Sequence, residues 1–224
     1  PVCLSQHVRW KVGWELLFAD ACPEHQVWLI DVCQCGRVIT WDRCDFGKCD
    51  CGRPFQWQKP AQCPESVAGL SALLLDKALR KPEASNLGPV GRLSVGQLQR
   101  LIRFLGTYGD TQPGPRPQKI SYQDRLSVSW QITSLAAEIL TGWPECLYRI
   151  LDRLQHERVV VGGGRLSGRF GYLYTALYKA FPEDEFSSLR EAFENYVVDH
   201  WRGALGERNR RFPPEILQRS AWIP

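Results

Sequence analysis

The chain has 224 residues, of which 44% are hydrophobic and 23% are charged, a composition that allows a packed core and argues against wholesale disorder. Its formal net charge is +4, which permits contact with nucleic acid but does not require it. No apolar run approaches the roughly 20 residues that cross a bilayer, and the first residues do not resemble a signal peptide, so we expect no membrane partner.

The cysteines are unevenly distributed along the chain. Seven of the nine fall within the first 51 residues, and Cys63 and Cys146 stand apart. A secreted disulfide protein would usually spread its cysteines through the fold. Clusters of short Cys-x-Cys and Cys-x2-His units fit metal ligation in a reducing compartment better.

Residues 1–60 are rich in Cys, Gly and Trp and carry only short apolar stretches. Two of these stretches, 27–30 and 37–41, are typical of strands in small hairpins. Such a segment has too little apolar bulk to fold alone. A bound metal would therefore supply the missing stability.

The first candidate metal site combines Cys3 with the unit Cys22-Pro23-Glu24-His25. A tight turn lets the thiolate and the imidazole of this unit face one ion at about 2.0–2.3 Å. A closed structural zinc site needs a fourth ligand. Pro1-Val2-Cys3 resembles the end of a Cys-Pro-x-Cys unit, so we expect that ligand to precede Pro1, with His7 as the nearby substitute. Both ends of the chain read as cut, and we expect a fragment of a longer protein.

The second candidate site uses the same four-residue unit twice, as Cys33-Gln34-Cys35-Gly36 and Cys49-Asp50-Cys51-Gly52. Glycine after the second cysteine allows a positive φ, so that backbone amides can point at the thiolates. Four thiolates carry too much charge to sit together without a cation. Cys44 is a fifth cysteine in the loop and could replace one of the four.

The sequence disfavours three other interpretations of the cysteines. Disulfides within Cys-x-Cys pairs are strained and uncommon. A redox dithiol lacks the βαβ context that such motifs have. A catalytic zinc needs an open position and usually a glutamate base, and although Glu24 lies inside the first unit, the deaminase pattern is absent. Structural zinc is therefore favoured, and no residue is assigned a catalytic role.

The rest of the chain has helical periodicity. A helix can open at Pro64-Glu65, and Ser94 and Gln97 form a capping box. Apolar residues recur at helical spacing through 67–74, 98–105, 132–140, 147–154, 170–178 and 186–201. Gly142-Trp143-Pro144 separates two of these helices. Residues 108–120 and 161–164 are expected to be loops, and a last short helix is expected after residue 213.

These patterns predict a mainly α protein in two parts. Residues 1–60 form a tandem zinc-finger segment on small β-hairpins, and residues 61–224 form a helical domain. The predicted cofactors are two structural Zn²⁺ ions.

The motifs resemble those of a known family. The cysteine-rich part resembles the zinc block of the TniQ/TnsD family of transposon target-selection proteins. The residues that carry the resemblance are Pro1-Val2-Cys3-Leu4, Arg9-Trp10, Trp14 and Cys22-Pro23-Glu24-His25, followed by the two Cys-x-Cys-Gly units. The later part of the chain looks like the helical segment that follows the zinc block in this family. The residues concerned are Gly142-Trp143-Pro144, the run from Phe170 to Tyr174, and Trp201 with the basic run from Arg208 to Arg211. The resemblance covers most of the chain, and the zinc block is its most specific part.

The resemblance implies zinc ligands and partners. Its ligands correspond to Cys3, Cys22 and His25 for one ion, and to Cys33, Cys35, Cys49 and Cys51 for the other. Family members bind attachment-site DNA or dock on a CRISPR RNA-guided effector complex, and they recruit the AAA+ ATPase TnsC. The implied location is the bacterial cytoplasm. Since we expect a fragment, we expect the family's usual amino-terminal segment, implicated in contact with TnsC, to lie outside these residues.

Nucleic acid would be held through its phosphates by arginine and lysine. Three basic patches stand out, one beside the second metal site, one around the glycine-rich stretch and one near the carboxyl end. The candidate contacts in them are Arg43, Lys48, Arg53, Arg165, Arg169, Arg202, Arg208, Arg210 and Arg211, and the patch around the glycine-rich stretch also includes Arg149, Arg153 and Arg158. A charge cluster of this size is often only a solvated face.

We therefore expect a transposon target-selection adaptor that is not an enzyme. Two alternatives come from other classes of protein. A generic zinc-finger DNA-binding regulator would bind its own DNA site and ignore TnsC. A zinc-dependent hydrolase or deaminase would need an open coordination position, which four closed protein ligands would exclude.

Overall fold

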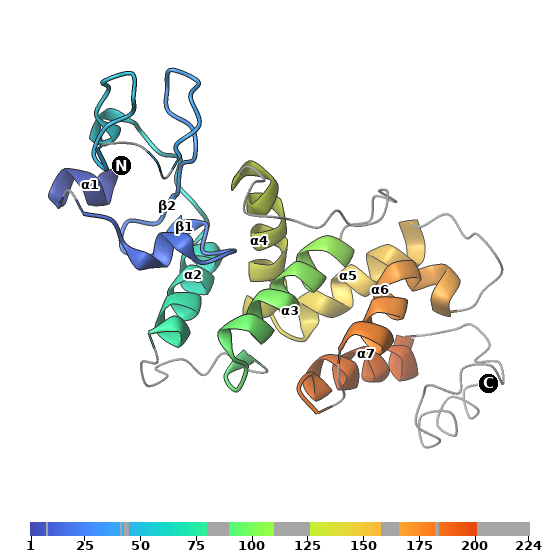
Figure 1. Ribbon diagram of the computed structural model, residues 1–224. Coiled ribbons are helices and arrows are strands. Elements are labelled where there is room, and N and C mark those ends of the chain that lie inside the picture. Colours follow the sequence, from blue (N-terminus) through green and yellow to red (C-terminus); the bar gives the residue numbers. More distant parts are fainter. Residues whose placement is uncertain are drawn as a thin grey trace.

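The computed structural model describes residues 1–7, 9–40, 42, 45–79, 90–109, 126–157, 166–181 and 184–200. Within these residues the chain is mainly helical, with seven α-helices and one small antiparallel hairpin near the amino terminus. Figure 1 shows the cysteine-rich segment at one end of the molecule and α5, α6 and α7 at the other, with α4 between them. The predicted fold class is confirmed.

The cysteine-rich segment holds only short elements. They are α1 (Val2–Gln6), a 3-10 helix η1 (Val12–Glu15), strands β1 (Ala21–Cys22) and β2 (Val27–Trp28), and a second 3-10 helix η2 (Phe55–Trp57). The hairpin pairs Ala21 with Trp28 and Cys22 with Val27.

The strand expected at residues 37–41 does not form among the residues described there. Val38 makes a single antiparallel bridge with Val32 instead. The tight turn at Cys33–Gly36 lies between the two bridged residues, and the ladder does not continue as a named strand beyond them.

The helical part follows the predicted apolar spacing. The helices are α2 (Glu65–Ala78), α3 (Val95–Tyr108), α4 (Leu126–Thr141), α5 (Glu145–Glu157), α6 (Leu166–Ala180) and α7 (Ser187–His200). The capping box of α3 is present, since Ser94 Oγ accepts from the Gln97 N–H at 3.3 Å and Gln97 Oε1 accepts from the Ser94 N–H at 2.6 Å. The loops expected within 110–120 and 161–164 and the helix expected after residue 213 lie outside the described residues.

One apolar core joins most of the elements. It contains the buried faces of α2 to α7 and also Phe18, Ala19 and Ala21 from the cysteine-rich segment. The core therefore continues across residue 60. The division into two domains at that residue, which was predicted from composition, stays a prediction. No described helix has both the length and the apolar character of a membrane span.

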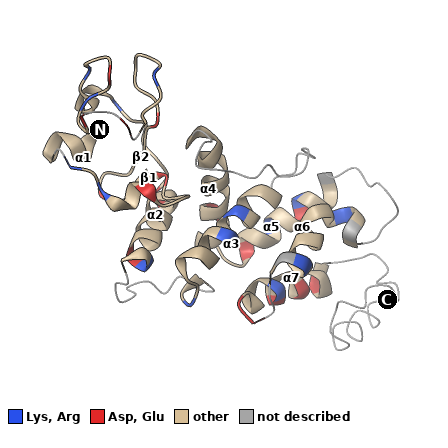
Figure 2. Ribbon diagram, viewed as in Figure 1, with Lys and Arg blue, Asp and Glu red and all other residues tan. Residues whose placement is uncertain are grey.

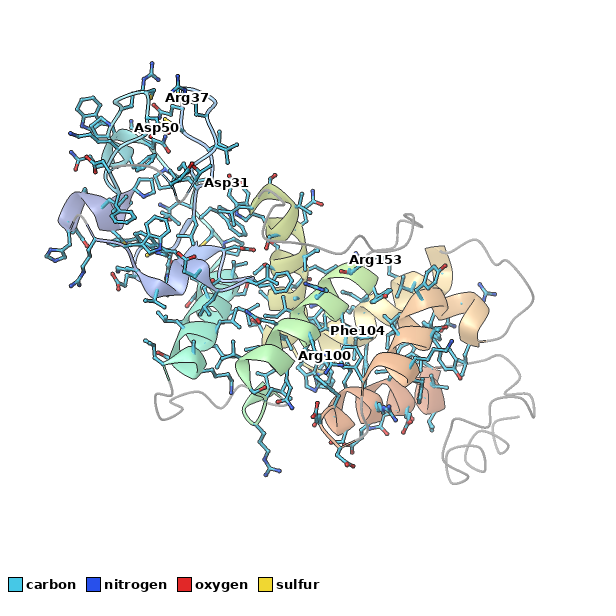
Figure 3. All side chains as sticks on the ribbon, viewed as in Figure 1. Asp31, Arg37, Asp50, Arg100, Phe104 and Arg153 are labelled. Atoms are coloured by element: carbon cyan, nitrogen blue, oxygen red, sulfur yellow. The ribbon has the colours of Figure 1, made fainter. Side chains whose placement is uncertain are left out.

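Two carboxylates of the cysteine-rich segment bind α4. Asp20 is 2% exposed, and its Oδ2 accepts hydrogen bonds from Ser129 Oγ at 2.6 Å and Thr133 Oγ1 at 2.5 Å. Asp31 Oδ2 accepts from the Leu126 N–H at 2.8 Å, at the first turn of the same helix. Figure 3 shows Asp31 between the cysteine-rich loops and α4. These bonds fix the amino-terminal half of α4 against the segment.

Removal of the buried Asp20 carboxylate is expected to destabilise this junction. Burial raises the pKa of Asp20, and the bonds from Ser129 and Thr133 act in the opposite direction. Asp20→Ala leaves two buried hydroxyls without their acceptor and should lower the free energy of unfolding by about 2–4 kcal/mol. Asp20→Asn keeps an acceptor oxygen and should cost less than half as much. Denaturant unfolding compares the two variants, and equal losses would contradict the assigned role of the two hydroxyl bonds.

Candidate metal centres

Four cysteine sulfurs come together in the second candidate site. Cys33, Cys35, Cys49 and Cys51 offer sulfur atoms that all lie within 4.8 Å of one another. Cys33 and Cys51 are 3.9 Å apart, and Cys35 and Cys49 are 3.8 Å apart. A tetrahedral zinc ion with bonds of about 2.3 Å to sulfur holds its ligands roughly 3.8 Å apart, so the four thiols fit such an ion.

Two equivalent turns build this group. The Cys33 N–H donates to the Arg37 carbonyl at 2.8 Å and the Gly36 N–H donates to the Cys33 carbonyl at 2.8 Å. The Cys49 N–H donates to the Arg53 carbonyl at 2.9 Å, and the Gly52 N–H donates to the Cys49 carbonyl at 2.8 Å. The two glycines have φ of +87° and +85°. The positive φ expected at both glycines is confirmed.

Two thiols of this group, Cys35 and Cys49, have shifted pKa values. A backbone hydrogen bond from Arg37 lowers the pKa of Cys35 to about 7. The backbone bond from Cys51 acts to lower the pKa of Cys49, but desolvation and the neighbouring thiols outweigh it and raise that pKa to about 12. Cys49 therefore resists ionisation beside its neighbouring thiols. A divalent cation removes this resistance because it replaces protons as the positive charge among the sulfurs.

The first candidate site lies at the β1–β2 hairpin. Cys22 ends β1, His25 lies in the turn, and Cys3 lies on α1. Cys3 Sγ is 3.4 Å from Cys22 Sγ, and His25 Nδ1 is 3.3 Å from each sulfur. These separations are slightly shorter than the roughly 3.5–3.8 Å between two ligands of tetrahedral zinc, and they place three zinc-compatible donor atoms around one point.

The fourth group brought to the first site is a carboxylate. Glu24 joins Cys3, Cys22 and His25 in the cluster, although the sequence prediction did not include it among the ligands. Both oxygens of Glu24 accept from Lys11 Nζ at 2.7 Å, and this bond lowers the pKa of Glu24. The position of Glu24 between two ligands was visible in the sequence. Its ion pair with Lys11 was not.

The two candidate centres are neighbours that share apolar packing. Trp14 packs against the cluster around Cys3 and Cys22 and also against the cluster around Cys33 and Cys49. Trp10 meets Trp14 edge to face, with ring centroids 4.9 Å apart. A bound ion at either centre would therefore stiffen a surface that contacts the other.

The remaining cysteines and the alternative ligand lie outside both groups. All eight cysteines in the described part of the chain are free of disulfide bonds. Cys63 and Cys146 are buried and belong to neither metal group, and His7 is exposed and also belongs to neither. Cys44 lies outside the described residues.

The predicted nucleic-acid contacts are only partly within the described residues. Lys48 is exposed and pairs with Asp45 at 3.8 Å, and Arg53 is exposed. Arg169 is half-buried and donates from Nη1 to the Gln155 carbonyl at 3.1 Å. The structure does not describe the others, which are Arg43, Arg165, Arg202, Arg208, Arg210 and Arg211.

Comparison of the chain with protein-family models, with curated proteins and with solved structures gave no match in any of the three.

Proposed function

We propose that the chain is a zinc-stabilised recognition and assembly module that serves as a target-selection adaptor in bacterial transposition. In this role it joins attachment-site DNA, or a CRISPR RNA-guided complex, to the AAA+ ATPase TnsC. It makes and breaks no covalent bond itself. The adaptor role rests on the resemblance of its motifs to the TniQ/TnsD family.

The observation that carries this proposal is the pair of adjacent cysteine-rich groups. Cys33, Cys35, Cys49 and Cys51 would hold one Zn²⁺. Cys3, Cys22 and His25 would hold the other, with the Glu24 carboxylate as the fourth group at that site. Four protein thiolates around an ion leave no position for a substrate, which is the arrangement of a structural site. The zinc would supply folding free energy to loops that bury little apolar surface.

The link between the cysteine-rich segment and α4 supports an assembly role. Asp20 and Asp31 bond to α4, and Trp28 stacks on Trp130 with ring centroids 4.9 Å apart. Loops that are fixed by metal and tied to a helix keep one orientation. A partner that contacts both parts then meets a preorganised surface.

Charged side chains are distributed over both parts of the molecule. Figure 2 shows lysine and arginine among aspartate and glutamate on the cysteine-rich loops and along α5 to α7. Arg37 and Arg153 are both exposed, the first at the outer end of the loops and the second on α5 (Figure 3). Such cations suit phosphate contacts, which position a protein on DNA without reading its sequence.

A mobility-shift assay with DNA from the attachment region tests DNA binding. We expect the zinc-loaded protein to shift this DNA, a chelator to abolish the shift, and added Zn²⁺ to restore it. Co-precipitation with TnsC tests the assembly role, and we expect the zinc-loaded protein to retain TnsC. DNA binding without TnsC would instead indicate a zinc-finger DNA-binding regulator. Absence of both interactions would overturn the proposal.

A further inference from the structure

Trp57 is unusually exposed for a tryptophan. It ends η2 and is 69% exposed, and it is the largest of the strongly exposed apolar side chains in the described part of the chain. Tryptophan normally buries most of its large surface. An exposed tryptophan on an ordered element is therefore a candidate contact with another molecule.

The surrounding chain holds Trp57 in a defined position. Phe55, two residues before it, is 2% exposed and packs with Leu4, Cys33 and Cys49. The Phe55 N–H donates to the Gly47 carbonyl at 2.9 Å, and the Gln58 N–H donates to the Phe55 carbonyl at 3.0 Å. Gln58, on the other side of Trp57, is also buried. The buried side chains of Phe55 and Gln58 thus hold this turn in place, with the exposed Trp57 beside the second metal site.

The local charge favours an anionic partner. No acidic residue occurs between Asp50 and Glu65, and this stretch includes Arg53 and Lys59. Both cations are exposed. The ion pairs found among the described residues involve neither of them. No carboxylate within this stretch itself therefore repels a phosphate group at Arg53 or Lys59.

The polar and charged side chains next to Trp57 in the sequence favour contact with a nucleic-acid base over contact with an apolar protein surface. Gln56 is exposed next to Trp57, and Arg53 and Lys59 flank the pair in the sequence. Phe46, which precedes the Gly47 that bonds to Phe55, is a second exposed aromatic side chain in this region and is 47% exposed. Exposed aromatic rings accompanied by cations are the arrangement by which proteins stack unpaired bases and hold their phosphates.

From these observations we infer that Trp57 is a stacking platform for an unpaired base of single-stranded nucleic acid. Arg53 and Lys59 contact the neighbouring phosphates. The inference rests on the proposed function and deepens it, because it specifies which nucleic-acid form the cysteine-rich segment contacts. Bases within a duplex are already stacked on one another and cannot offer their faces to Trp57.

The inference is tested by titrating the zinc-loaded chain into a labelled oligothymidylate and following the anisotropy of the label. A duplex of matched length is the second probe. Trp57→Ala should weaken binding of the single strand about tenfold, since stacking on one aromatic ring contributes of that order. Binding of the duplex should change less than about twofold, and Trp57→Phe should retain most of the single-strand affinity because it keeps an aromatic face. Tyr172→Ala is the matched control, because Tyr172 is 49% exposed on α6 and should have no effect.

Lys59→Glu is an independent variant at an exposed position. It should weaken single-strand binding and reduce the dependence of affinity on salt, because one phosphate contact is replaced by repulsion. The inference is overturned if the wild-type chain does not bind the single strand, if Trp57→Ala binds it as the wild type does, or if both probes weaken equally. Attachment-site binding and TnsC retention are measured separately, so those results judge the proposed function on their own.

Discussion

Cys49→Ala is expected to release the second metal ion and to unfold the loops from residue 33 to residue 55 while the helices remain folded. Cys49 is buried, and it stands with Leu4, Cys33 and Phe55 in a very small apolar cluster. Structural zinc contributes on the order of 10–16 kcal/mol to small metal-stabilised folds, far more than this cluster can replace. Hydrogen exchange read peptide by peptide should show lost protection in these loops and retained protection in α3 and α5.

Cys146→Ala is the matched control for this prediction. Cys146 is also a buried cysteine, but it lies on α5 and belongs to neither metal group. Its replacement should leave the metal content and the loop protection as in the wild type. If Cys49→Ala kept full protection of the loops, the metal would not be what holds them.

Gly106→Ala is expected to cause a large loss of stability in the helical part. A methyl group at Gly106 would lie 2.2 Å from the Ile132 carbonyl oxygen and 2.6 Å from Ile132 Cγ2. The first of these atoms is backbone, so α3 and α4 would have to separate. Overpacking of this kind costs about 1–3 kcal/mol, and the backbone contact places Gly106→Ala at the upper end, near 3 kcal/mol. Denaturant unfolding followed by far-ultraviolet circular dichroism measures the loss.

Gly69→Ala is expected to raise the stability, although Gly69, like Gly106, lies inside a helix. Gly69 lies inside α2, and a methyl group there would meet no atom within 4 Å. Alanine is the better helix former, so this variant should gain about 0.5–1 kcal/mol. Equal effects of the two substitutions would mean that α3 and α4 do not approach each other at Gly106.

Local signals in the sequence were sufficient to predict helices α2 to α7 and the grouping of the cysteines. The α3 capping box depends on Ser94 and Gln97, which are three residues apart, and the turns at Gly36 and Gly52 depend on equally short spacings. Such features are specified by neighbouring residues, so a pattern of a few positions predicts them.

Features that depend on distant residues were missed. Asp20 is separated by 109 residues from Ser129 and by 113 from Thr133, so nothing near Asp20 in the sequence indicates its burial. The non-helical backbone inside α6, where Gly171 has φ of 53°, interrupts a segment whose apolar spacing is continuous. Lys11 similarly reaches Glu24 only because the fold brings them together.

Elemental analysis of the purified chain tests the central claim, that two groups of thiolates with one imidazole bind structural zinc. The account predicts two zinc ions per chain, with one lost in Cys49→Ala and both retained in Cys146→Ala. Purified wild-type protein that carries no zinc, or whose Cys33, Cys35, Cys49 and Cys51 are recovered as disulfides, would contradict it.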